Sequence, residues 1–329
     1  MRGLFLVVLL LSCGAPDVPG PDWTQLPSSS TAPLRSPLQL HVDGTTLRDE
    51  AGAEVHLRGL NVCSLEFDRE GANWQLQPDG GSPLLDALAA PTRWNANVVR
   101  MPVNQEWFLT DDTYVARVET LIDAAAQRDL YVILDVQWEH AERTDPYQLN
   151  ILKQPTFGFG NTTEAFWHLA SGRLANRKNV LFDLINEPHD TAAVEVAEAM
   201  QKLVDRIHQS TPGAVLVVGG PDWAHSVSYY ADHPLRGDNV VYSAHQYLPY
   251  DTPSQFAQNF ERTAARAPVL LAEFGAEADQ VDGRLYQDVL IERAEAAGVD
   301  GWLVWAIGCG VSVDDDRGAI GAQLRSLNP

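Results

Sequence analysis

Two glutamates stand where an acidic side chain is unexpected. Glu187 closely follows the apolar run 180–185, and Glu273 lies near the end of the apolar run 268–274. A carboxylate at the end of a buried strand is costly unless it is paired or takes part in a reaction, and either residue alone could be an ordinary salt bridge at the rim of a fold. Together they could divide the work of glycoside hydrolysis, in which one carboxyl group protonates the leaving oxygen and the other attacks the anomeric carbon.

Polar and aromatic side chains also gather at the ends of the other apolar runs. They are Arg100, Asp135, Gln137, Trp138, Asn186, His245, Tyr247, Trp302 and Trp305. A run that merely reaches a turn would end in Gly, Asn or Asp. The repeated occurrence of Glu, His, Tyr and Arg therefore indicates one shared site.

The elements that must position these residues follow a regular rhythm of short apolar runs and longer helical patterns. The runs are 54–62, 97–103, 131–136, 180–185, 214–219, 240–247, 268–274 and 301–307. Near-continuous apolar runs are typical of parallel strands covered on both faces, and eight strand–helix units predict an α/β fold, the (β/α)8 TIM barrel. An open doubly wound sheet is the weaker alternative, because no Gly-rich phosphate-binding turn follows an early strand.

The segment before the barrel predicts a short N-terminal β-hairpin cap. Residues 38–42 alternate in polarity, and Asp43-Gly44 is a strong hairpin turn. In TIM barrels the chemistry lies at the C-terminal ends of the strands, so the polar residues above are expected to converge there. The long loop 138–160 is expected to be functional, as long loops on barrels usually are.

The charge narrows the range of partners. Asp and Glu outnumber Lys and Arg, which gives a formal net charge of −21. Such a surface repels phosphate backbones, so we expect no nucleic-acid partner and a protein that acts on a neutral polymer. We also expect a monomer. His225, His233 and His245 could suggest a metal-dependent barrel hydrolase, but their spacing fits no metal-ligand motif, and we expect neither a metal nor a cofactor.

The N-terminus predicts export. Arg2 and a short apolar run precede Leu10-Leu11-Ser12-Cys13, which resembles a bacterial lipoprotein cleavage box with Cys13 as the lipidated residue. We therefore expect a signal segment at 1–13, a flexible linker at 14–37 and one catalytic domain at 38–329, anchored to the cell surface by lipid or released. A plain secretory signal is the alternative, and both predict an exported protein.

The two remaining cysteines predict a bridge. Cys63 follows the first barrel strand and Cys309 follows the eighth, and these strands are neighbours in a closed barrel. An exported protein can oxidise such a pair. Two separate buried thiols are the alternative.

The motifs together resemble glycoside hydrolase family 5, the cellulase family, over about residues 38–329. The matching stretches are Leu57-Arg58-Gly59-Leu60-Asn61, Asn97-Val98-Val99-Arg100, Asn186-Glu187-Pro188, Ser243-Ala244-His245-Gln246-Tyr247, Glu273-Phe274-Gly275 and Trp305. The order and spacing of the last four make the resemblance specific, whereas Asn-Glu-Pro alone would be a modest signal.

The resemblance implies a role for each matching residue. Glu187 would be the acid/base and Glu273 the nucleophile. The supporting roles it implies are Asn186 at the sugar 2-hydroxyl, Arg100 and Tyr247 beside the nucleophile, His245 near the acid/base, and Trp305 as a stacking floor on the non-reducing side of the cleaved bond. We expect a nearby guanidinium to lower the pKa of Glu273 and partial desolvation to keep Glu187 protonated.

One position departs from the family pattern. Gln137 stands two residues after Asp135, where the family usually has a His that contacts substrate. The change affects substrate preference or turnover, and His140 could return to the site through a loop. The expected function is a retaining endo-β-1,4-glucanase. A β-mannanase or another β-glucanase, and a non-catalytic surface glycan-binding lipoprotein, are the alternatives.

Overall fold

The computed structural model describes residues 22, 25, 37–139, 163–275 and 280–328. The expectations for the signal segment, for Cys13, for almost all of the linker, for His140 and for the rest of the loop after Glu139 fall outside these residues. Within the described ranges, no helix is both long enough and apolar enough to cross a bilayer.

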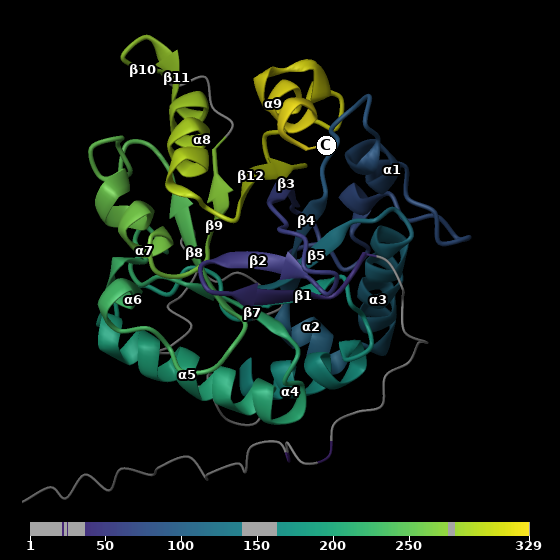
Figure 1. Ribbon diagram of the computed structural model, residues 1–329. Helices are drawn as coiled ribbons and strands as arrows, with labels where there is room; N and C mark the ends of the chain where they lie inside the picture. The colour runs from purple at the N-terminus through teal and green to yellow at the C-terminus, as the bar shows by residue number, and fades with distance from the viewer. Residues whose placement is uncertain (1–21, 23–24, 26–36, 140–162, 276–279, 329) are drawn as a thin grey trace, which may run out of the picture.

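Eight parallel strands close into a barrel, as the rhythm of apolar runs predicts (Figure 1). The barrel strands are β3 (Leu57–Val62), β4 (Val98–Asn104), β5 (Tyr131–Trp138), β6 (Val180–Asp183), β7 (Val215–Gly219), β8 (Val240–Gln246), β9 (Val269–Phe274) and β12 (Gly301–Ile307). Each strand pairs with its neighbour in the chain, and β12 closes the barrel against β3. The prediction of a (β/α)8 barrel is confirmed.

Helices form the outer ring around these strands (Figure 1). The α-helices are α1 (Pro83–Ala89), α2 (Gln105–Thr110), α3 (Asp112–Ala126), α4 (Thr163–Leu174), α5 (Ala193–Ser210), α6 (Ser228–Asp232), α7 (Arg262–Ala264), α8 (Tyr286–Ala297) and α9 (Ala319–Leu327), with short helical turns η1 (Ala72–Trp74), η3 (Ala257–Glu261) and η4 (Asp315–Arg317). α3 begins where the Asp111 side chain accepts hydrogen bonds from the N–H groups of Thr113 and Tyr114.

Two apolar cores account for the stability of the barrel. The inner core is filled by branched residues of the strands, including Val98, Ile133, Val217 and Leu270. The outer core lies between the strands and the helices, where α5 buries an apolar stripe at helical spacing. The strands are therefore covered on both faces, which explains why they are apolar almost without interruption.

The predicted hairpin cap closes the N-terminal end of the barrel. β1 (Leu40–Asp43) and β2 (Thr46–Asp49) pair antiparallel and lie across the barrel strands in Figure 1. The Leu47 N–H donates to Asp300 Oδ1 at 2.7 Å, just before β12 begins, and the Leu47 side chain joins the inner core. A second small hairpin, β10 (Gln280–Val281) and β11 (Arg284–Leu285), precedes α8.

Cys63 and Cys309 are joined by a disulfide, with their Cα atoms 6.1 Å apart. The bridge spans the seam where β12 meets β3, at the C-terminal ends of both strands. The sequence-based expectation of a bridge agrees with this arrangement.

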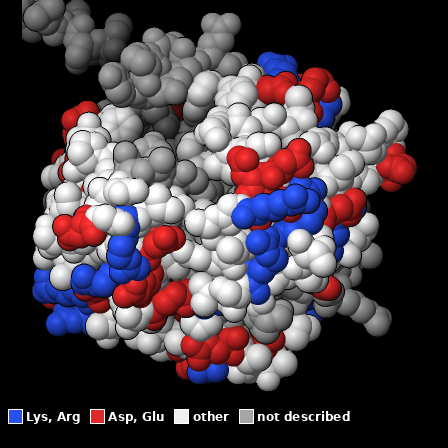
Figure 2. All heavy atoms as spheres, turned by 90° about the horizontal axis from the view of Figure 1, so that it is seen from above, with Lys and Arg blue, Asp and Glu red and all other residues white. Residues whose placement is uncertain are grey.

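The surface charge is mixed on the face seen in Figure 2, where acidic and basic side chains lie next to one another. Elsewhere in the described residues, exposed ion pairs also join opposite charges, such as Arg262 with Asp232 at 2.5 Å. The net negative charge is therefore not gathered into one acidic patch on this face.

Candidate active site

The polar residues singled out from the sequence lie within the barrel strands or just beyond their C-terminal ends. Arg100 is in β4, Gln137 and Trp138 end β5, Asn186 and Glu187 follow β6, His245 is in β8, Tyr247 follows it, Glu273 is in β9 and Trp305 is in β12. Because all eight strands run in the same direction, these residues share one end of the barrel.

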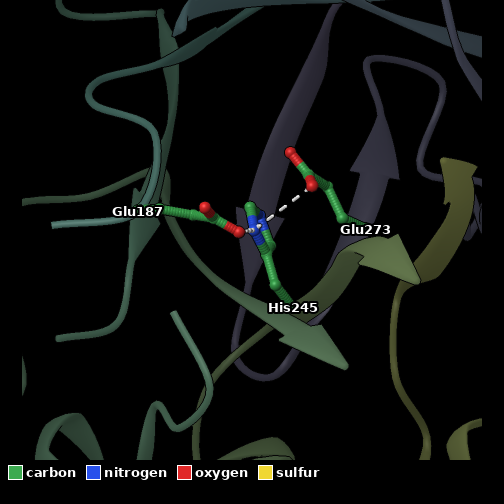
Figure 3. Close-up of side chains that lie close together, drawn as sticks. All are labelled: Glu187, His245 and Glu273. Atoms are coloured by element: carbon green, nitrogen blue, oxygen red, sulfur yellow. Dashed lines mark hydrogen bonds and ion pairs between the residues drawn. The ribbon is translucent and has the colours of Figure 1, made fainter. Parts of the chain in front are cut away.

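Glu187 and Glu273 face each other across His245 (Figure 3). His245 Nδ1 lies 2.8 Å from Glu187 Oε1 and 3.7 Å from Glu273 Oε2. One ligand atom of each of the three residues lies within 4.8 Å of the others. This separation suits a retaining glycosidase, whose carboxyl groups are about 5–5.5 Å apart, and is too short for the intervening water of an inverting one.

The backbone at Glu187 is strained. Its φ is 45°, in the left-handed region that residues other than Gly rarely adopt. Such a conformation costs about 1–3 kcal/mol and persists only where the surroundings enforce it. Here the preceding Asn186 N–H donates to the carbonyl of Val136 in β5 at 3.1 Å, which ties the turn after β6 to the neighbouring strand.

Arg100 lies beneath the two glutamates and is fully buried. Its guanidinium donates to Glu273 Oε1 at 2.5 Å and to Asp183 Oδ2 at 2.9 Å, and it lies 3.0 Å from Asp135 Oδ1. It also donates to the side-chain oxygen of Asn186 at 3.0 Å. One buried cation therefore holds three carboxyl groups and the amide of Asn186 in fixed positions.

The charges of this cluster do not balance if every group is ionised, because three carboxylates share one guanidinium. Burial raises the pKa of Asp135 well above its ordinary value; the charge of Arg100 opposes the rise, and the charges of Asp183 and Glu273 add to it. The neutral form of Asp135 is thereby favoured. Burial also raises the pKa of Asp183, and the charge of Arg100 opposes that rise.

The pKa of Glu273 differs from the sequence-based expectation. Burial raises the pKa of the Glu273 carboxyl above its ordinary value, and the Glu187 charge adds to the rise. Arg100 and the Tyr247 hydroxyl, which donates to Glu273 Oε2 at 2.9 Å, oppose it. Arg100 lowers the pKa of Glu273 as expected, but the loss of solvent, which the expectation left out, outweighs this effect.

His245 is held neutral. Burial lowers the pKa of its ring to about 4. Near neutral pH the ring therefore forms its hydrogen bond with Glu187 without placing a positive charge between the two carboxyl groups.

The remaining predicted residues surround this centre. Gln137 is 8% exposed near the end of β5, and the ring of the next residue, Trp138, lies 6.1 Å from that of Phe67. Trp305 pairs through its backbone with Gly275, just after the strand that carries Glu273. The expectation for Trp302 was wrong, because it lies at the start of β12, is 1% exposed and donates to Glu295 at the other end of the barrel.

Several residues of the site were missed in the sequence. Asn61 in β3 and Asp183 in β6 both bond Arg100, at 3.1 and 2.9 Å. Glu66, in the loop after β3, is 3% exposed, and burial raises its pKa to about 7. The signal that could have found them is a polar residue within or directly after an otherwise apolar run.

The three histidines that could have suggested a metal site, His225, His233 and His245, do not come together. His225 lies 2.7 Å from Asp251, and the ring of His233 stacks on Tyr229. Among the described residues, the group with metal-ligand spacing is Glu187, His245 and Glu273. Both oxygens of Glu273 already accept hydrogen bonds, one of them from a guanidinium, so this donor set does not suit a cation.

Comparison with known proteins relates the chain to cellulases. Endoglucanase E-5 of Thermobifida fusca is 28% identical over 305 residues, which cover 87% of this chain and 59% of that protein. Endoglucanase MaCel5A of Microbulbifer sp. (strain ALW1) is 26% identical over 79% of this chain and 50% of that protein. The chain therefore spans only about half to three-fifths of the length of these two relatives.

Solved structures share the fold. The catalytic domain of Thermobifida fusca endoglucanase Cel5A (E5) has a TM-score of 0.67 at 24% identity, covering 88% of this chain and 96% of that one. The β-glucanase SdGluc5_26A from Saccharophagus degradans has a TM-score of 0.71 at 21% identity, covering 93% and 99%. The sequence profile described as Cellulase (glycosyl hydrolase family 5) matches residues 48–310. With most of its length matched by that profile, the chain belongs to glycosyl hydrolase family 5.

Proposed function

We propose that the protein is a retaining endo-β-1,4-glucanase in which Glu187 is the acid/base and Glu273 the nucleophile. The observation that carries the proposal is the separation of the two carboxyl groups, whose nearest ligand atoms lie within 4.8 Å with His245 between them. That distance leaves room for a sugar carbon to be attacked directly by one carboxylate.

The proposed reaction has two steps. Glu273 attacks the anomeric carbon while Glu187 gives its proton to the departing oxygen, so a glycosyl ester forms and the leaving sugar is released with its new hydroxyl. Glu187, now ionised, then removes a proton from a water molecule that attacks the same carbon, and the carboxylate of Glu273 departs. Two inversions at one carbon retain its configuration.

The contacts of Glu273 support its role as nucleophile. Arg100 and Tyr247 donate to separate oxygens of the carboxylate, at 2.5 and 2.9 Å. These bonds hold the carboxylate in one orientation and favour its ionised form against the effect of burial. Glu187 is the more accessible of the pair, with a side chain 19% exposed against 4% for Glu273, as suits a group that must exchange protons with water.

The relatives support the substrate class. The two curated relatives described above are endoglucanases, and the β-glucanase of Saccharophagus degradans has been crystallised with cellotetraose. We propose that this chain cleaves the same kind of β-linked glucan, with supporting substrate contacts from Asn186, Gln137, Trp138 and Trp305.

We further propose that the protein is exported. The signal-like segment ending at Cys13 supports this, and so does the Cys63–Cys309 disulfide, since such bridges persist in oxidising compartments. A lipid anchor on Cys13 and a monomeric state stay predictions.

The test compares wild type with Glu273→Gln on a panel of soluble β-1,4-glucan, β-1,3-glucan and β-mannan. We expect wild type to cut the β-1,4-glucan, the variant to lose this activity, and NMR of the fresh product to give the β-anomer first. Glu119→Gln is the matched control, because Glu119 is also buried but pairs with Arg173 on the helical ring. An initial α-anomer refutes the retaining mechanism. A wild type that cuts nothing but is retarded in a gel containing one polymer supports the glycan-binding alternative.

A further inference from the structure

The segment between β7 and α6 carries a histidine that the proposed reaction does not yet use. The Trp223 N–H donates to the carbonyl of Pro188 at 3.1 Å, and the His245 N–H donates to the carbonyl of Ala224 at 2.8 Å. These bonds fasten the segment to the residue after Glu187 and to the strand of His245. His225 therefore lies on the Glu187 side of the catalytic pair, away from β9.

This segment is also held in an unusual conformation. Asp222, Trp223 and Ala224 have φ values of 58°, 59° and 56°, three successive left-handed residues of which none is Gly. Each costs about 1–3 kcal/mol and persists only where its surroundings enforce it, a pattern that clusters at functional sites. The Trp223 ring stacks on His189 at 3.7 Å between centroids, and this contact helps to hold the turn.

A buried aspartate orients His225. Asp251 is 1% exposed, and its Oδ2 lies 2.7 Å from His225 Nδ1. A carboxylate only accepts hydrogen bonds, so Nδ1 is the protonated nitrogen. The side chain of His225 is 25% exposed, and its Nε2 makes no hydrogen bond within the described residues, so the ring turns this second nitrogen toward solvent.

Asp251 is itself fixed from two further sides. Its Oδ2 also accepts from the Tyr247 N–H at 2.8 Å, and its Oδ1 accepts from the Asn259 side chain at 2.8 Å. The same carboxylate thus positions His225 and the backbone of the tyrosine that donates to Glu273.

On these contacts, and resting on the proposed function, we infer that His225 is a substrate-binding residue whose Nε2 forms a hydrogen bond with a hydroxyl of the leaving-group sugar, with Asp251 as its positioning residue. The leaving oxygen must approach Glu187, which protonates it, so the leaving sugar lies on the side of the pair where His225 lies. A protonated ring makes a charge-assisted bond, which is stronger than a neutral one.

The surrounding charges favour the protonated ring. The hydrogen bond that His225 donates to Asp251 raises the pKa of His225 above its ordinary value, partial burial opposes the rise, and the charges of Asp251, Asp222 and Glu187 add to it. His245 stays neutral, and the ring of Tyr250 lies 5.6 Å from that of His225 between centroids. The cationic form of His225 therefore persists to a higher pH than for a free histidine.

The test compares two substrates that differ only on the leaving side. The leaving group of cellotetraose is a sugar, whereas the leaving group of 4-nitrophenyl β-cellobioside is 4-nitrophenol, which has no sugar hydroxyls. For His225→Ala, we expect the ratio of kcat/KM for cellotetraose to kcat/KM for the aryl glycoside to fall about 10- to 100-fold, as for the loss of a hydrogen bond to a charged group. In wild type this ratio falls as the pH rises through the pKa of His225, and in His225→Gln, which cannot titrate, it does not.

Asp251→Asn tests whether Asp251 positions His225, and Asp300→Asn is its matched control. Both aspartates are buried and accept backbone N–H groups, but Asp300 does so at the opposite end of the barrel. We expect Asp251→Asn to lower the ratio and Asp300→Asn to leave it as in wild type. An unchanged ratio in a folded His225→Ala protein overturns the inference. A wild type that releases neither product instead refutes the proposed function.

Discussion

The sharpest consequence of the site concerns Tyr247 and the pH at which Glu273, the proposed nucleophile, ionises. The Tyr247 hydroxyl donates to Glu273 Oε2 at 2.9 Å. Burial and the neighbouring carboxylates raise the pKa of this hydroxyl well above its ordinary value, so it remains a donor at every practical pH. Tyr247→Phe removes this one bond and leaves Arg100 on the other oxygen, Oε1, at 2.5 Å.

The magnitude follows from the worth of a hydrogen bond to a charged group, about 1.5–3 kcal/mol. At 1.36 kcal/mol per pKa unit, its loss raises the pKa of Glu273 by about 1–2 units. The sign is unambiguous, because the bond favours the ionised carboxylate and its removal favours the neutral acid. Since Glu273 must be ionised to attack, activity in the variant is lost at a higher pH as the solution is acidified.

The assay is the pH dependence of kcat/KM on 4-nitrophenyl β-cellobioside, which reports the ionisation of the free enzyme. We expect the acidic limb to move upward by about 1–2 pH units in Tyr247→Phe. Tyr131→Phe is the control, because Tyr131 donates to the carbonyl of Leu38 beneath the barrel, away from both glutamates. An acidic limb that coincides with that of wild type would show that Tyr247 does not govern the ionisation of Glu273.

Two further predictions concern stability. Replacing both Cys63 and Cys309 by Ala should lower the free energy of unfolding by about 2–5 kcal/mol, because the disulfide closes a long loop at the barrel seam. Urea unfolding of wild type and variant measures this difference. Equal midpoints for the two proteins would contradict it. For Glu66, whose pKa of about 7 in the folded protein exceeds its unfolded value, the folded state binds the extra proton between about pH 4 and 7 and loses stability as the pH rises through that window. Glu66→Gln should lack this dependence, and wild-type and variant stabilities that run parallel between pH 4 and 8 would refute it.

The fold was largely predictable from the sequence because its signals are local. Each barrel strand is a run of apolar residues covered on both faces, and α5 carries its apolar stripe at helical spacing. The two glutamates were predictable for the same reason, since a carboxylate beside a buried strand is visible without any tertiary contact. The seam disulfide was geometrically possible once the barrel was assumed, because closure makes the first and last strands neighbours, and the structure decided between a bridge and two separate thiols.

The energetics of the site were decided by the tertiary structure. Arg100 is shared by three carboxyl groups that come from β5, β6 and β9, and only the closed barrel brings these strands around one guanidinium. The pKa of Glu273 rises because the surrounding fold removes its solvent, an effect that no pattern of neighbouring residues encodes.

The pairing of His225 with Asp251 was also decided by the tertiary structure. They lie 26 residues apart in two different loops, and neither belongs to a periodic pattern, yet their side chains meet at 2.7 Å beside the proposed catalytic pair. Periodicity is determined by residues that are close in the chain, so the sequence alone determined the strands, the helices and the two acidic positions. Distances, burial and charge balance depend on residues that meet only after folding, and for that reason the tertiary structure decided which groups support the reaction.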